Sequence, residues 1–255
     1  SLEVFDPDGF GVPLFIFAED AQGDQFSQEL RLNYDSGEKF AGFVGVSYFD
    51  EDGAQHVPLT FDERTTQMLL GGLALPASQA ELDAMIAANP TLALNLTVLA
   101  QSGGTVAIPL KPIHNEIYEN QGRTESTEFF ADGSYALTDR LELTAGLRYT
   151  SDKKDSRFYA WLPEGPSNLT GAGLLLVPTT GMEQSTDSFD GWTYRIAAKY
   201  ILNDNWNAFA NHARGRRPEV ITPSGTTNSP RFTTLPAEEV DSFEAGLKGE
   251  TLDGA

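Results

Sequence analysis

Residues 140–150 read RLELTAGLRYT, and apolar side chains alternate in them with polar or small ones. One face would carry Leu141, Leu143, Ala145, Leu147 and Tyr149, and the opposite face Glu142, Thr144, Gly146, Arg148 and Thr150. A period of two is typical of a β-strand whose two faces meet different surroundings. The stretch therefore predicts a strand with one apolar and one polar face.

The same alternation recurs along the chain and predicts an all-β, antiparallel fold. Seven segments show it: Phe26–Tyr34, Lys39–Phe49, Thr127–Leu137, Arg140–Thr150, Trp192–Leu202, Trp206–Ala213 and Ser242–Lys248. Each is close to the roughly 9–11 residues that a tilted membrane-spanning strand needs. No stretch approaches the roughly 18 consecutive apolar residues of a transmembrane helix.

The connections between these segments alternate in length. Short turns rich in Asp, Asn and Gly lie at residues 35–38, 138–140 and 203–205, and long connections at Asp50–Glu125, Ser151–Ser188 and Gly215–Glu238. Tight turns at one end and long loops at the other are typical of an outer-membrane β-barrel. The sequence therefore predicts a segment of a transmembrane barrel with long extracellular loops.

One of these loops is predicted to carry a short helix. Ser78-Gln79-Ala80-Glu81 has the pattern of a capping box, Leu82, Met85 and Ile86 follow at helical spacing, and Asn89-Pro90 would end the helix. Leu92–Val98 and Thr105–Leu110 are candidates for further short strands in the same loop.

The composition excludes several classes of protein. The 255 residues hold 17 Lys and Arg against 37 Asp and Glu, a formal net charge of −20, and no cysteine. Nucleic-acid binding depends on clustered basic residues, so nucleic acid is not an expected partner. The lack of cysteine excludes disulfide scaffolds, zinc–cysteine sites, iron–sulfur clusters and thiol catalysis.

Five segments, taken in order, resemble the TonB-dependent outer-membrane receptors. They are FSQELRL (26–32), GVSYFDE (45–51), LTDRLELTAGLRYT (137–150), ARGRRP (213–218) and PAEEVDSFEAGLKG (236–249). Arg216 stands where the family usually has an aromatic residue. The resemblance implies a barrel of about twenty-two strands around a plugged lumen. Residues 1–255 would form a middle part of that barrel, without the plug domain or the C-terminal strands.

The resemblance also implies a function. Such receptors lie in the outer membrane of Gram-negative bacteria and import scarce ligands, most commonly ferric siderophores, with energy supplied through TonB. The expected partners are outer-membrane lipid and lipopolysaccharide, the plug and remaining strands, the TonB complex through an N-terminal region, and a siderophore-like ligand. No cofactor is expected, because the iron would arrive inside the ligand. The alternative is a soluble all-β carbohydrate-binding or carbohydrate-active module, in which loop lengths would be more even.

Aromatic residues near the ends of the expected strands are candidates for an interfacial girdle. They are Trp192, Tyr194, Tyr149, Trp206, Tyr48 and Phe49. The alternative is cross-strand packing in a soluble sheet.

Arg214, Arg216 and Arg217, together with His212, are candidates for contact with an anionic ligand or with lipopolysaccharide at the barrel rim. Pairing of the arginines with loop carboxylates such as Glu219 is the favoured alternative. Arg148, Arg195 and Glu142 are expected to face the lumen, or to pair with neighbours across the sheet.

Neither a metal site nor a catalytic site is predicted. His56, His114 and His212 are not at ligand spacing, and the acidic run at residues 50–53 lacks the oxygen pattern of a calcium loop and is read as a solvated turn. No nucleophile elbow or phosphate-binding loop occurs. The sequence therefore indicates a protein that is not an enzyme.

Overall fold

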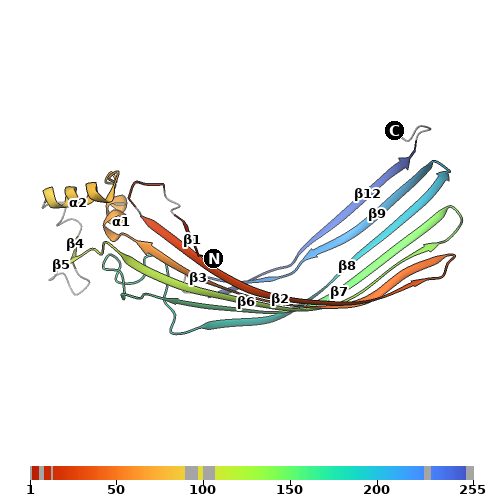
Figure 1. Cartoon of the computed structure of the whole chain (residues 1–255), viewed down its shortest axis with the longest axis horizontal. Coiled ribbons are helices and arrows are strands. Elements are labelled where there is room, and N and C mark those ends of the chain that lie inside the picture. Colours follow the sequence, from red (N-terminus) through yellow and green to blue (C-terminus); the bar gives the residue numbers. More distant parts are fainter. Residues whose placement is uncertain are drawn as a thin grey trace.

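The computed structural model describes residues 2–5, 9–12, 14–89, 97–99, 107–226 and 231–250. Its main feature is one curved antiparallel sheet of eight strands (Figure 1), in the order β1-β2-β3-β6-β7-β8-β9-β12. The bounds are β1 Leu2–Phe5, β2 Phe15–Asp35, β3 Phe40–Phe61, β6 His114–Ala136, β7 Leu141–Trp161, β8 Glu183–Asn203, β9 Trp206–Arg217 and β12 Glu238–Gly249. The all-β antiparallel prediction is confirmed.

Five of these strands are about twice as long as predicted. β2, β3, β6, β7 and β8 have 21, 22, 23, 21 and 21 residues. Beyond the predicted ends, as at Asp50-Glu51-Asp52, both faces carry polar side chains, so the alternation fades while the backbone ladder continues. The acidic run read as a solvated turn therefore lies within β3. The eighth strand, β1, was not predicted.

The two ends of the sheet differ as the sequence predicted. Tight hairpin turns join β2 to β3, β6 to β7 and β8 to β9 at one end (Figure 1). Short polar side chains close them: Asp35 Oδ1 accepts from the Gly37 amide at 2.8 Å, and Thr138 Oγ1 accepts from the Leu141 amide at 3.0 Å. Gly37 has φ of +73°, which only glycine adopts at low cost.

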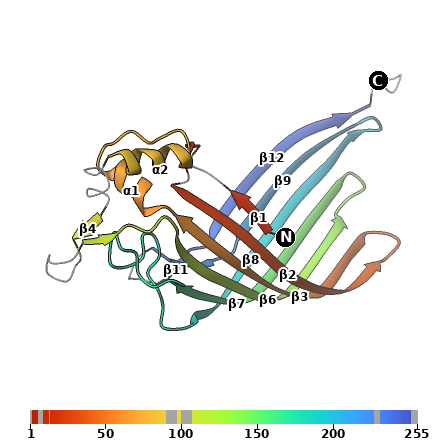
Figure 2. The same cartoon turned by 60° about the vertical axis from the view of Figure 1, so that its left-hand side comes forward.

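The long connections lie at the other end and carry short elements (Figure 2). These are α1 Glu63–Leu70, α2 Gln79–Ala88, β4 Thr97–Leu99, β5 Ala107–Pro109, β10 Val220–Pro223 and β11 Phe232–Leu235. The predicted helix is α2, whose N-cap Ser78 accepts from the Glu81 amide. α1 was missed, although its N-cap Asp62 accepts from the Arg64 amide. β4 overlaps the end of the candidate segment Leu92–Val98 and extends one residue beyond it, and β5 falls in the candidate segment Thr105–Leu110. Residues 92–96 and 105–106 lie outside the described part.

Cross-strand register separates the sheet into two faces. Leu30, Val46, Phe129, Tyr149 and Trp192 are directly opposed in consecutive pairs, so all five share one face. Large apolar side chains on this face are open to the surroundings; Leu30 is 72% exposed and Phe243 76%. In a membrane barrel the apolar band faces outward, so we call this the outer face and the opposite one the inner face.

Toward the long connections, the inner face carries a compact apolar core. Val57, Leu59, Phe158 and Ala160 project from β3 and β7, and Leu176 of the β7–β8 connection packs on them. Phe232 of β11 packs against the same cluster. The connection at residues 162–182 and the described parts of the next one, 218–226 and 231–237, are therefore folded inward over the inner face.

Among the described residues, no helix has the length and apolar character needed to cross a membrane.

Candidate functional site

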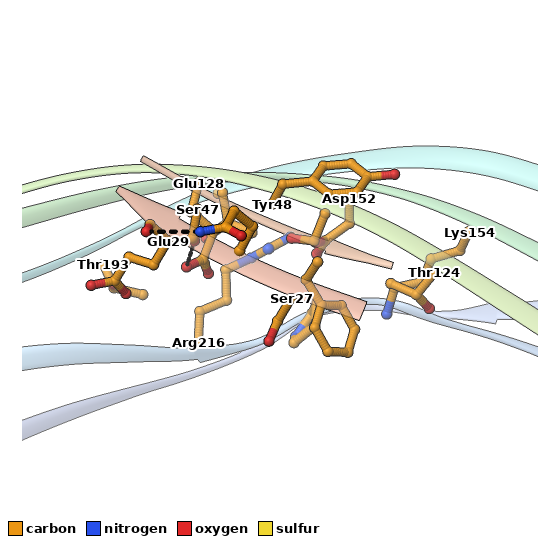
Figure 3. Close-up of a pocket in the computed structure, with 16 residues that line it drawn as sticks. Ser27, Glu29, Ser47, Tyr48, Thr124, Glu128, Asp152, Lys154, Thr193 and Arg216 are labelled. Carbon is orange, nitrogen blue, oxygen red and sulfur yellow. Dashed lines mark hydrogen bonds between the residues drawn. The ribbon is translucent and has the colours of Figure 1, made fainter. Parts of the chain in front are cut away.

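A polar pocket of about 470 Å³ lies on the inner face, close to the inward-folded connections. Side chains from six strands, β2, β3, β6, β7, β8 and β9, line it (Figure 3). Hydroxyl groups and carboxylates predominate, which suits a surface that recognises a polar ligand or a polar protein segment.

Strand register builds the pocket from two adjacent rows. Glu29, Ser47, Glu128 and Thr150 are directly opposed in one row across β2, β3, β6 and β7. Ser27, Phe49, Ser126 and Asp152 form the next row. Because opposed residues of antiparallel strands point to one face, residues far apart in sequence are brought together here.

Within the first row, Glu128 is held by its neighbours. Its carboxylate accepts from Ser47 Oγ at 2.9 Å and from Thr150 Oγ1 at 3.2 Å, and Arg148 Nη1 lies 3.4 Å from it. The carboxylate is therefore fixed as one wall of the pocket.

Arg216 enters the pocket from β9 (Figure 3). A Cβ atom at Gly191 would lie 2.5 Å from Cδ of Arg216, so glycine leaves the passage through which this side chain crosses β8. The Arg216 side chain is only 7% exposed and pairs with Glu219, whose carbonyl oxygen accepts from Lys154 Nζ at 2.6 Å. Through these two contacts, Arg216 and Lys154 hold Glu219, and with it the chain that follows β9, next to the pocket.

A second polar cluster is fully buried beneath the long connections. His114 Nε2 lies 3.1 Å from Glu116 Oε1, and His114 Nδ1 lies 4.0 Å from Glu63 Oε1; none of the three side chains is exposed. Glu116 accepts from the amides of Leu174, Leu175 and Leu176. Glu63 accepts from those of Lys111 and Asn168, so β6, α1 and the β7–β8 connection meet at one histidine.

The structure places the girdle candidates at two levels and on two faces. Tyr48, Tyr149, Trp192 and Tyr194 lie on the outer face at the end of the apolar band nearer the long connections, and Trp206 lies at the turn end. Tyr149 and Trp192 are directly opposed, with ring centroids 4.8 Å apart. Phe49 lies on the inner face, one residue out of phase with Tyr48, and lines the pocket.

The arginine-rich candidates do not form one site. Arg214 and His212 lie on the outer face, where Arg214 makes two hydrogen bonds to Asp241 and His212 stacks on Phe243 with ring centroids 4.2 Å apart. Arg217 pairs with Glu238 at 3.4 Å, and Arg216 points inward. The structure thus contains the carboxylate pairing that the sequence offered as the alternative.

Arg148, Arg195 and Glu142 lie on the inner face. Arg195 donates to both carboxylate oxygens of Asp132, at 2.7 and 2.8 Å.

Sequence reasoning missed Ser126, Glu128, Asp152 and Lys154. Asp152 and Lys154 continue the period-two pattern of β7 into a segment assigned to a loop, and that continuation was the available signal. Ser126 directly precedes the predicted strand Thr127–Leu137, and Glu128 lies within it. Within the described ranges, no group of three or more His, Asp or Glu side chains is placed to hold a metal ion.

Residues 8–255 match the family model described as TonB dependent receptor-like, beta-barrel. Pesticin receptors of Yersinia enterocolitica and Yersinia pestis are 24% identical over 131 residues, which is 51% of this chain and 17% of theirs. The ferric yersiniabactin uptake receptor FyuA from Yersinia pestis aligns with a TM-score of 0.57 and 16% identity, covering 94% of this chain and 28% of that one. The siderophore receptor PiuA from Acinetobacter baumannii aligns with a TM-score of 0.48, 16% identity, and coverage of 94% and 30%. This chain thus spans less than a third of the length of these relatives.

Proposed function

Because this chain belongs to the TonB-dependent receptor family, we propose that it forms part of the barrel wall of a receptor that imports a ferric siderophore. Members of the family are transport receptors of the Gram-negative outer membrane, not enzymes. The same membership excludes the soluble carbohydrate module that the sequence left open as an alternative.

The observation that carries the proposal is the division of the sheet into an apolar outer face and a polar inner face with a pocket of about 470 Å³. An apolar band suits contact with lipid, and a polar wall suits the lumen through which a polar ligand passes. The name of one relative, the ferric yersiniabactin uptake receptor, supports a ferric chelate as that ligand.

The domain assignment and the partners follow as parts of this proposal. Residues 1–255 are one section of the barrel, and the plug and the remaining strands complete the receptor. TonB energises it through an N-terminal region, and lipid and lipopolysaccharide surround the outer face. Trp192, Tyr194, Tyr149, Trp206 and Tyr48 form its interfacial girdle.

Radioactive iron uptake tests the function. The source bacterium, grown without iron, supplies its own ferric chelate in spent medium, and uptake of ⁵⁵Fe from that medium is compared between wild-type cells and cells lacking this gene. We expect uptake to be lost in the deletion strain, restored by the full-length gene, and abolished by a protonophore that removes the energy source. Equal uptake with and without the gene would refute the proposal.

A further inference from the structure

Two buried polar side chains in the inner-face pocket lack a partner within the described residues. Asp152 is 4% exposed and Ser126 8% exposed, and they are directly opposed on β7 and β6. Neither side chain makes a hydrogen bond or ion pair with any other described residue. Because the polar atoms of both side chains reach the open space of the pocket, a group that enters it can supply the missing contact.

Both side chains line the open space of the pocket, and Figure 3 shows Asp152 there. Neighbouring positive charges are already engaged elsewhere. Lys154, two residues from Asp152 on the same strand, donates to the carbonyl of Glu219, and Arg216 pairs with the Glu219 carboxylate. Arg148 lies against Glu128.

The charge around the pocket is therefore unbalanced. Among the charged residues that line the pocket, Glu29, Glu128 and Asp152 bring three carboxylates, against the two positive side chains of Lys154 and Arg216. A single positive charge next to Asp152 would balance them. An anionic group would meet an unpaired carboxylate instead and would be repelled.

We propose that this pocket is a binding site for one cationic, hydrogen-bond-donating group, an ammonium or a guanidinium, with Asp152 as its counter-ion. Ser126 Oγ offers an acceptor beside Asp152, and Ser27, Thr124 and Thr193 add hydroxyls around the space. Such a group can come from a small ligand that enters the lumen or from a basic side chain elsewhere in the receptor. The inference concerns the chemistry of the site and does not depend on iron import.

Charged thiol reagents test the proposal without a known ligand. The 255 residues contain no cysteine, so Ser126→Cys introduces a single reporter into this part of the full-length receptor. Its thiol is reacted with a trimethylammonium-ethyl thiosulfonate and, separately, with a sulfonato-ethyl thiosulfonate. Ala172→Cys, in the exposed β7–β8 connection, supplies the reference ratio of the two rates.

Asp152→Asn is the decisive variant, because it keeps the shape of the side chain and removes its charge. Heat-modifiable gel mobility verifies that each receptor is folded. Thr193→Cys, on β8 across the pocket, serves as the reporter if Ser126→Cys does not fold.

We expect the cationic reagent to be favoured at Ser126→Cys by about tenfold over the reference ratio, and Asp152→Asn to remove the preference. This result would assign the site to a group that enters from solution. A thiol that reacts only after Asp152→Asn would also support the proposal, with a basic side chain of the receptor as the occupant. A rate ratio equal to the reference, a preference unchanged by Asp152→Asn, or a thiol inert in both backgrounds would overturn it.

Discussion

His114 Nε2 lies 3.1 Å from Glu116 Oε1, and both side chains are completely buried. The opposite ring nitrogen, Nδ1, has no hydrogen-bond partner among the described residues and faces the buried carboxylate of Glu63 at 4.0 Å. Backbone amides already hold both carboxylates, so the imidazole is the group that joins them. Three segments are thereby tied together over the inner face, and this cluster fixes how the β7–β8 connection covers the sheet.

Replacing His114 should therefore release that connection. His114→Gln removes the ring between two buried carboxylates, and leaving a buried hydrogen-bonding group without its partner typically costs about 1–3 kcal/mol. Chemical denaturation of the full-length receptor in lipid vesicles measures the change. The matched control is His56→Gln, since His56 is 45% exposed and lies 3.5 Å from Glu119, a surface pair of small value. Equal effects of the two substitutions would contradict a special role for His114.

A thiol reporter separates local opening from general instability. Leu176 is 5% exposed, and its own amide donates to Glu116 Oε2 at 2.7 Å. We expect an impermeant maleimide to label Leu176→Cys slowly in the wild-type background and at least about tenfold faster with His114→Gln. Ala172→Cys, already exposed, should be labelled at the same rate in both backgrounds.

Acid should loosen the same connection through Glu164. Burial raises the pKa of the Glu164 carboxyl, but hydrogen bonds from the Asn115 side chain and amide, at 2.9 and 3.2 Å, outweigh it, and its pKa lies below the ordinary value. A carboxyl with a lowered pKa stabilises the fold above its ordinary pKa, and the contribution disappears as the pH falls through the lowered value. Wild type and Glu164→Gln should therefore differ in melting temperature at neutral pH and converge in acid. A difference that grows on acidification would contradict this assignment.

The sequence predicted the membrane-level part of the sheet well, because lipid on one side and a polar lumen on the other impose a period of two. That constraint is weaker beyond the apolar band. Arg123 donates two hydrogen bonds to Asp50, at 3.0 and 2.8 Å, and these link β6 to β3 beyond the apolar band. Both residues are charged, so they add no apolar position to the sequence pattern. A polar strand and a polar loop have similar sequences, so the parts of the strands nearer the long connections were assigned to loops.

The pocket was out of reach for the same reason. Ser126 and Asp152 are ordinary polar residues in sequence, and only the pairing of β6 with β7 makes them neighbours. The Arg216 side chain reaches the inner face over Gly191 of the neighbouring strand β8. This contact depends on how two strands pair, so the sequence around either residue does not predict it. α2 was predictable because its cap and its apolar spacing are both local.

Tryptophan fluorescence tests the two faces directly. Trp192 and Trp206 lie on the outer face at opposite ends of the apolar band, whereas Trp161 stacks on Tyr159 near the far end of β7. On β2 the band runs from Phe26 to Tyr34, about 27 Å along the strand, close to the roughly 25 Å of an outer-membrane barrel. In vesicles of brominated lipid, we expect Trp192 and Trp206 to be quenched in single-tryptophan receptors, and Trp161 to be spared.

The corrected position of Phe49 supplies a sharper version of that experiment. Tyr48 and Phe49 are adjacent but lie on opposite faces. In a receptor with its own tryptophans replaced, Tyr48→Trp should be quenched by brominated lipid and Phe49→Trp should not. Quenching of both would mean that the inner face is exposed to lipid, and would refute the face assignment.

The isolated 255-residue chain should not form a soluble monomer. The described sheet ends at β1 on one side and β12 on the other, and an unpaired strand edge is a template for pairing with another chain. Its outer face adds a wide apolar surface; Leu30, Leu32 and Phe243 are each at least 70% exposed. Soluble monomers rarely expose contiguous apolar patches of more than a few hundred Å².

We therefore expect the chain to aggregate in buffer and to stay dispersed only in detergent, as measured by size-exclusion chromatography with light scattering. Substituting Leu30, Leu32 and Phe243 by serine removes much of the apolar surface but leaves both edges, so this variant should aggregate less without becoming monomeric. A detergent-free monomer that melts cooperatively would show that the chain buries its apolar face by itself, which the open sheet does not allow.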